Sequence, residues 1–219
     1  MINTCVIRMP KQGIINVLNR YKPAYIEENI KMTNQQENVL TNPAEKTKRL
    51  VTCSLFAAIL ALSAYFSFSL PLPGAPHITM QNFFVFLIAL LFPLADSFMI
   101  VLVWMLIGAI GLPVFIGGGA GFGYLIQPWG FYTVAFLIVA AVLPLIRGKN
   151  YSRIRYTISA LIGVLIIDLA GMVYLMGMNH YDLTTAISIG FLPFLPLDFL
   201  KAVAAAQLIP AFRRLQNIN

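Results

Sequence analysis

Three ionisable side chains lie within long apolar stretches of this sequence: Asp168, Asp198 and Lys201. A charge near the centre of a membrane costs on the order of 2.5–3.5 kcal/mol, so such residues usually face a cavity, a ligand or one another. Asp198 and Lys201 are three positions apart and therefore share a helix face. The spacing predicts a polar pocket in which Lys201 meets a ligand carboxylate and Asp198 accepts ligand N–H groups. A structural ion pair is the alternative, and for Asp168 the sequence favours neither role.

A glycine-rich segment at 117–123, GGGAGFG, is the second candidate for ligand contact. Glycine tolerates positive φ and lets a ligand approach the backbone closely, so this segment could offer backbone N–H and C=O groups to a ligand. A flexible connector is the alternative. The segment has no G-x-G-x-x-G register and no preceding strand, which excludes a dinucleotide fingerprint. The aromatic residues that follow it could stack on a ligand ring or form an interfacial belt: Tyr124, Trp129, Phe131 and Tyr132.

The composition requires an apolar solvent for most of the protein surface. Of the 219 residues, 59% are apolar and 11% are charged, whereas a soluble domain carries about 25% charged residues. The net charge of +7 comes from cations at the edges of apolar stretches, so nucleic acid is not an expected partner. No Cys/His cluster has metal-ligand spacing and no nucleophile motif is present. The sequence therefore predicts no metal, no cofactor and no enzyme, although acid–base chemistry by Asp168 and Asp198 is a weaker alternative.

Six apolar stretches predict the architecture. They lie at 50–70, 80–95, 97–116, 130–146, 154–177 and 186–212, and the second and fourth are short for the roughly 20 residues that cross a bilayer. The string LPFLPLD interrupts the sixth, so only 197–212 is expected to form a regular helix. Loop cations precede the first stretch, separate the fourth from the fifth and follow the sixth, which places both termini in the cytoplasm. The predicted fold is an all-α integral membrane protein with six transmembrane helices in the cell (inner) membrane.

The parts of the chain outside these stretches are polar. We expect a flexible cytoplasmic leader at 1–49, a membrane domain at 50–214 and a cytoplasmic tail at 215–219. The leader has no signal-peptide pattern, and Met32 offers an alternative translation start.

Two small residues in the first span, Ala57 and Ala61, are four positions apart. This spacing lets helices approach closely in lipid. The two alanines could dock a partner subunit or pack within the protein itself, and spacing alone favours internal packing.

Several strings taken together resemble the biotin-specific substrate-binding subunits of energy-coupling-factor transporters, the BioY family. They are HITMQ at 77–81, LIGAIGLPVFIGGGAG at 106–121, QPWGFY at 127–132 and PFLPLDFLK at 193–201. The third string diverges from the GPTGGY-like pattern of that family. The resemblance covers about residues 50–214.

The resemblance implies six helices, a biotin pocket and a multi-pass location in the cell membrane among its lipids. It implies ligand contacts from Asp198 and Lys201, with Gln81, Gly117, Gly118, Gly119 and Tyr132 as weaker candidates, and partner docking by Ala57 and Ala61. The implied partners are a transmembrane coupling subunit and two ATPase subunits, since this chain has no G-x-x-x-x-G-K-[ST] motif of its own. The predicted function is biotin capture and uptake. A different vitamin or small carboxylate is one alternative, and a membrane assembly protein without a ligand is another.

Overall fold

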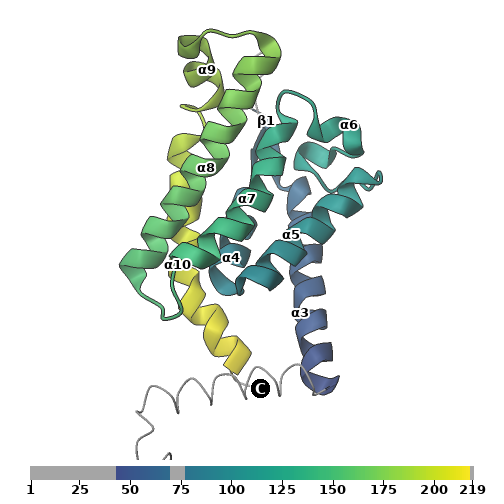
Figure 1. The fold of residues 1–219 in the computed structure, drawn as a ribbon, viewed down its shortest axis with the longest axis vertical. Helices are drawn as coiled ribbons and strands as arrows, with labels where there is room; N and C mark the ends of the chain where they lie inside the picture. Colours follow the sequence, from purple (N-terminus) through teal and green to yellow (C-terminus); the bar gives the residue numbers. More distant parts are fainter. Residues whose placement is uncertain (1–42, 70–76, 218–219) are drawn as a thin grey trace, which may run out of the picture. The chain divides into compact units, whose positions relative to one another are not determined.

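The computed structural model describes residues 43–69 and 77–217 (Figure 1). The chain divides into two compact units, residues 1–51 and 52–219. Most of the predicted leader, including Met32, lies outside the described residues. Helix α3 (Pro43–Leu62) begins within the predicted leader, seven residues before the expected first span.

The described chain is mostly helical. After α3 come α4 (Gln81–Leu91), α5 (Leu94–Ala109), α6 (Phe122–Leu125), α7 (Gly130–Ile146), α8 (Arg153–Asn179), α9 (Leu183–Gly190) and α10 (Leu195–Asn217). Two antiparallel strands, β1 (Ser67–Ser69) and β2 (His77–Thr79), follow α3. Two 3₁₀ turns, η1 (Ser63–Tyr65) and η2 (Ile116–Gly118), precede β1 and α6 respectively.

An apolar helix lies at each of the six predicted positions, but these helices differ in length. Helices α3, α8 and α10 are long and apolar enough to cross a membrane, whereas α4, α5 and α7 have 11, 16 and 17 residues. At 1.5 Å per residue α4 is only about 16 Å long. It ends before Phe92 because Pro93 disfavours helical backbone in the residue that precedes it.

Helix α9 falls in a region where we expected irregular chain. Its start is fixed by Asp182, whose Oδ2 accepts the backbone N–H groups of Thr184 at 3.1 Å and Thr185 at 3.2 Å. The hydrogen bond that the Thr185 hydroxyl donates also holds the pKa of the Asp182 carboxyl below its usual value. The regular helix resumes at Leu195, two residues earlier than predicted.

The helices from α4 to α10 pack around a shared apolar core. Helix α10 lies against α4 and α8, and α7 lies against α4, α5 and α8 (Figure 1). Large side chains such as Trp104, Phe86 and Phe136 are fully buried between them. The outer face is also apolar, with Leu106 and Ile158 more than half exposed. Apolar residues on both faces are expected of a bundle whose solvent is lipid.

Ala57 and Ala61 are half-buried and pack against this core. Next to them, the ring of Phe56 meets the ring of Phe92 edge-on, with 4.9 Å between centroids. The two alanines therefore have internal neighbours, as the spacing alone favoured, and only part of their surface is left for a partner.

Cations from two predicted cytoplasmic segments meet at one end of the bundle. Arg147, which follows α7, is 7% exposed and donates to the Tyr156 hydroxyl at 2.6 Å and to the Phe92 carbonyl at 2.7 Å. Arg213, near the end of α10, donates to the same hydroxyl at 2.5 Å. The α7–α8 turn and the part of α10 around Arg213 therefore lie at the same end of the bundle.

Candidate ligand-binding site

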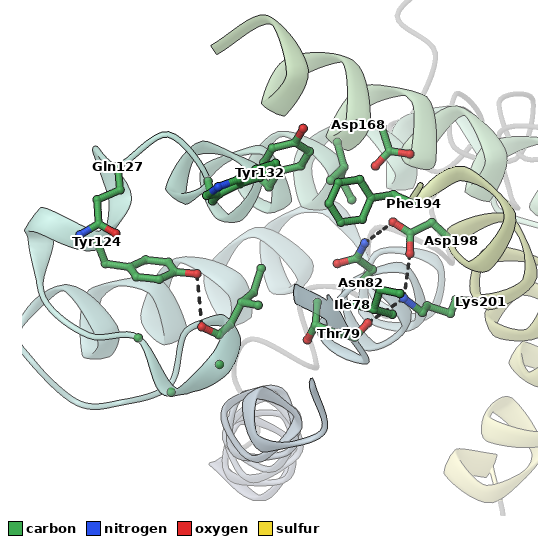
Figure 2. A pocket seen from close by; sticks show the side chains of 16 residues that line it. Ile78, Thr79, Asn82, Tyr124, Gln127, Tyr132, Asp168, Phe194, Asp198 and Lys201 are labelled. Carbon is green, nitrogen blue, oxygen red and sulfur yellow. Dashed lines mark hydrogen bonds and ion pairs between the residues drawn. The ribbon is translucent and has the colours of Figure 1, made fainter. Parts of the chain in front are cut away.

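A cavity of about 480 Å³ lies among β2, the glycine-rich segment, α7, α8 and α10 (Figure 2). Its volume is within the range of roughly 300–1,000 Å³ that is typical of small-molecule sites. The cavity is lined by residues that are far apart in sequence: Ile78, Thr79, Asn82, Ile116, Gly117, Gly118, Gly119, Tyr124, Gln127, Trp129, Tyr132, Ile167, Asp168, Phe194, Asp198 and Lys201.

Asp198 and Lys201 form the predicted pair. The Lys201 ammonium donates to Asp198 Oδ1 at 2.8 Å and to the Thr79 carbonyl at 2.8 Å. Asn82 Nδ2 donates to the other carboxylate oxygen, Oδ2, at 2.6 Å. The side chains of Lys201 and Asp198 are 11% and 3% exposed. An ammonium has three N–H donors, and two of these have partners here, so one remains for a ligand acceptor.

Asp168 is the second acid in the cavity wall. It lies midway along α8, is 1% exposed, and its Oδ2 has no hydrogen-bond partner within the part of the chain that the structure describes. In Figure 2 it lies on the same side of the cavity as Asp198 and Lys201. A buried oxygen without a donor costs about 1–3 kcal/mol, so this position calls for a ligand donor more strongly than Asp198 does.

The glycine-rich segment forms a second wall, where Gly117 and Gly118 adopt φ of 69° and 79°. Residues with a side chain rarely adopt this conformation, which explains the glycines at these two positions. The backbone N–H of Gly118 bonds the Phe115 carbonyl at 2.9 Å. The segment thus folds into a hydrogen-bonded turn in the cavity wall.

Three aromatic rings line the cavity between the charged pair and the glycine-rich segment. The Trp129 and Tyr132 rings stack at 5.8 Å between centroids, and Phe194 lies 5.5 Å from Tyr132. The Tyr132 hydroxyl donates to the Gly190 carbonyl at the end of α9, which fixes the ring. Phe131, by contrast, stacks on Tyr174 at 4.4 Å and does not line the cavity.

Gln81 lies outside the cavity wall, although it was a candidate for ligand contact. It is fully buried, and its Nε2 donates to the Val114 carbonyl at 2.7 Å. Trp104 Nε1 donates to the same carbonyl at 3.1 Å. Gln81 therefore holds the chain that leads into the glycine-rich segment, and its position supports an indirect role.

Sequence reasoning missed Asn82 and Thr79, both of which support the charged pair. Asn82 is a polar residue at the start of an apolar helix, and that was the available signal. Its partner Asp198 is 116 positions away, a contact that spacing rules do not predict.

The cavity has distinct ends. Asp168, Asp198 and Lys201 lie at one side in Figure 2, and Tyr124 and Gln127 at the other. Such a cavity suits a small ligand that carries polar groups on an apolar body. No group of three or more His, Cys, Asp or Glu side chains suited to a metal occurs in the described ranges.

Comparisons with known proteins agree with one another. The BioY family model matches residues 32–217. A protein of Thermotoga maritima named biotin transporter BioY is 34% identical over 169 residues, which cover 77% of this chain and 98% of that protein. Biotin transporter BioY2 of Lactococcus lactis is 30% identical over 72% of this chain and 86% of its own length.

A solved structure shares the fold. The crystal structure of the S-component for biotin from an ECF-type ABC transporter matches with a TM-score of 0.71 at 23% identity, over 80% of this chain and 95% of that one. The family consists of transporter components rather than enzymes. From the match to the family model and the identity to full-length relatives, this membrane protein belongs to the BioY family.

Proposed function

We propose that this chain captures biotin as the substrate-binding component of an energy-coupling-factor transporter. The family and the printed names of its relatives supply the ligand. The observation that carries the proposal is the cavity in which, among the described residues, Lys201 retains a free donor and the buried Oδ2 of Asp168 has no hydrogen-bond partner.

The arrangement supports an orientation for the ligand. The Lys201 ammonium, already bonded to Asp198 and Thr79, would meet the biotin carboxylate with its third donor. Asp168 would accept a ureido N–H group. The stacked rings of Trp129 and Tyr132 and the backbone of the glycine-rich segment would contact the apolar body.

The remaining predictions on architecture and partners belong to the same proposal. The protein would cross the inner membrane six times, with both termini in the cytoplasm. The shared basic end of the bundle supports this orientation. A transmembrane coupling subunit and two ATPases would supply the energy. The exposed parts of α3 near Ala57 and Ala61 are the candidate contact for the coupling subunit.

The test is equilibrium binding of radiolabelled biotin to the purified chain, with unlabelled vitamins as competitors. We expect saturable binding of one biotin per chain that only biotin-like compounds displace. Displacement by an unrelated small carboxylate would favour the alternative ligand. Absence of binding by biotin and by the other vitamins would favour an assembly role.

A substitution behind the cavity wall should reduce affinity without touching the ligand. A β-carbon at Gly171 would lie 2.3 Å from the Tyr132 ring. Gly171→Ala should therefore push this ring toward the cavity, destabilise the protein by about 1–3 kcal/mol and weaken biotin binding. The matched control is Gly177→Ala on the same helix, where a β-carbon meets nothing within 4 Å. Thermal unfolding and binding titrations of both variants measure the effect, and equal behaviour of the two would contradict it.

A further inference from the structure

Cations without acidic partners gather at the α7–α8 turn. The sequence has Arg147, Lys149, Arg153 and Arg155 there, and no Asp or Glu between residues 97 and 167. Within the described ranges, no carboxylate forms an ion pair with any of these four cations. The ion pair between Lys201 and Asp198 lies elsewhere, at the cavity. Arg147 is occupied by Tyr156 and Phe92, whereas the other three side chains are exposed.

An apolar groove of about 440 Å³ begins beside these cations. It is lined by Ile146, Ser152, Ile154, Arg155, Ile158, Ser159 and Ile162. Three of the isoleucines are four positions apart, so they form one stripe along α8 that starts at its basic end. Over these two turns the stripe is about 12 Å long.

Arg155 joins the groove to the turn. Its Nη1 atom lies so close to Gly148 that a β-carbon there would be 2.7 Å away. The guanidinium therefore lies over the α7–α8 turn, while the residue lines the groove. Ile154 and Ile158 are 73% and 52% exposed along the same surface.

We propose that this groove binds one anionic phospholipid, with an acyl chain along the isoleucine stripe and the phosphate on Arg155 and its neighbours Arg153 and Lys149. The charge arrangement selects this occupant. A zwitterionic lipid would bring its ammonium to a surface of three exposed cations, whereas an anionic headgroup neutralises part of that charge. Each cation near an anionic headgroup contributes roughly a fivefold preference. The site lies at the basic end, away from the biotin cavity, and does not depend on which solute the protein carries.

Native mass spectrometry of the purified chain in detergent tests this site, with phosphatidylglycerol, phosphatidylcholine and inorganic phosphate added separately. We expect one retained phosphatidylglycerol, bound at least about fivefold more tightly than phosphatidylcholine. Equal retention of the two lipids would overturn the proposal. The melting temperature of the chain is measured with each addition as well. If inorganic phosphate alone raised it as much as phosphatidylglycerol does, the proposal would also be overturned, since the site would then bind an ion without an acyl chain in the groove.

Two kinds of variant separate headgroup from chain. The double variant Arg153→Gln, Arg155→Gln should abolish most of the preference for phosphatidylglycerol, whereas Arg214→Gln, which removes a charge from an exposed position of α10, should keep it. Ile158→Trp should fill the groove and reduce retention of either lipid. Its control is Leu169→Trp, at a 44% exposed position of α8 outside the groove. Unchanged lipid retention in Ile158→Trp, with a normal melting temperature, would refute the groove as the site.

Discussion

Lys201→Ala is expected to weaken biotin binding by about a hundredfold or more. The substitution removes the free donor that would meet the ligand carboxylate and leaves Asp198 buried without its cation. Losing one partner of a buried charge pair costs about 2–5 kcal/mol in binding. Isothermal titration or filter binding with labelled biotin measures the change. Lys149→Ala removes the same side chain from an exposed turn and should bind like the wild type.

A second variant separates lost binding from lost folding. The double variant Asp198→Asn, Lys201→Met removes both charges together, so no uncompensated charge stays buried. It should unfold near the wild-type temperature and still bind biotin poorly. Wild-type affinity in Lys201→Ala would show that the pair is structural, which was the alternative that its spacing left open.

Asp168→Leu is expected to weaken biotin binding by roughly 10- to 100-fold while raising the melting temperature. The two effects have one cause, because Asp168 Oδ2 is buried without a hydrogen-bond donor among the described residues. Removing an unsatisfied buried polar group is stabilising, and leaving the buried N–H group of the ligand without an acceptor costs about 1–3 kcal/mol. This opposition of stability and affinity distinguishes a ligand contact from a structural role, for which both quantities would fall.

Pairing protein variants with ligand variants tests the orientation of biotin. Asp168→Leu should cost little affinity for a biotin analogue with its ureido nitrogens methylated, and Lys201→Ala should cost little for biotin methyl ester. These analogues already lack the group that each residue meets. If either substitution weakened biotin and its analogue equally, the effect would come from altered packing. If the wild-type chain bound no biotin at all, the ligand itself would be wrong.

The sequence predicted the ends of a helix best where polar residues or glycines flank the helix. Helix α7 occupies 130–146, as predicted, because a glycine- and proline-containing segment precedes it and Arg147 and Gly148 follow. The end of α5 was predicted seven residues too late, at 116 rather than 109, because apolar residues continue through the turn. Hydropathy reports the solvent around a segment, and it does not mark where the helical hydrogen bonds stop.

The site was predictable only in its local part. Asp198 and Lys201 share a helix face, so their pairing followed from a spacing of three. Asn82 and Thr79 reach the pair from elements more than a hundred positions away, and Gln81 turned out to face Val114. These contacts depend on how α4 packs against α10. No local pattern in a single sequence encodes that packing.

The basic residues between α7 and α8 would also specify the orientation of the protein in the membrane more than once. No Asp or Glu occurs between residues 97 and 167. Arg147 and Lys149 lie in the turn between α7 and α8, and Arg153 and Arg155 lie in the first turn of α8. Biosynthetic topology follows the excess of Lys and Arg in short loops, and acidic residues hardly count. When Arg153 and Arg155 are neutralised, Arg147 and Lys149 remain in that turn, and Arg213 of α10 shares the Tyr156 hydroxyl with Arg147. Variants of Arg153 and Arg155 should therefore still insert in the native orientation. A change in their lipid preference can then be assigned to the lost side chains. With fewer cations in this region, such variants could also change the orientation of the protein.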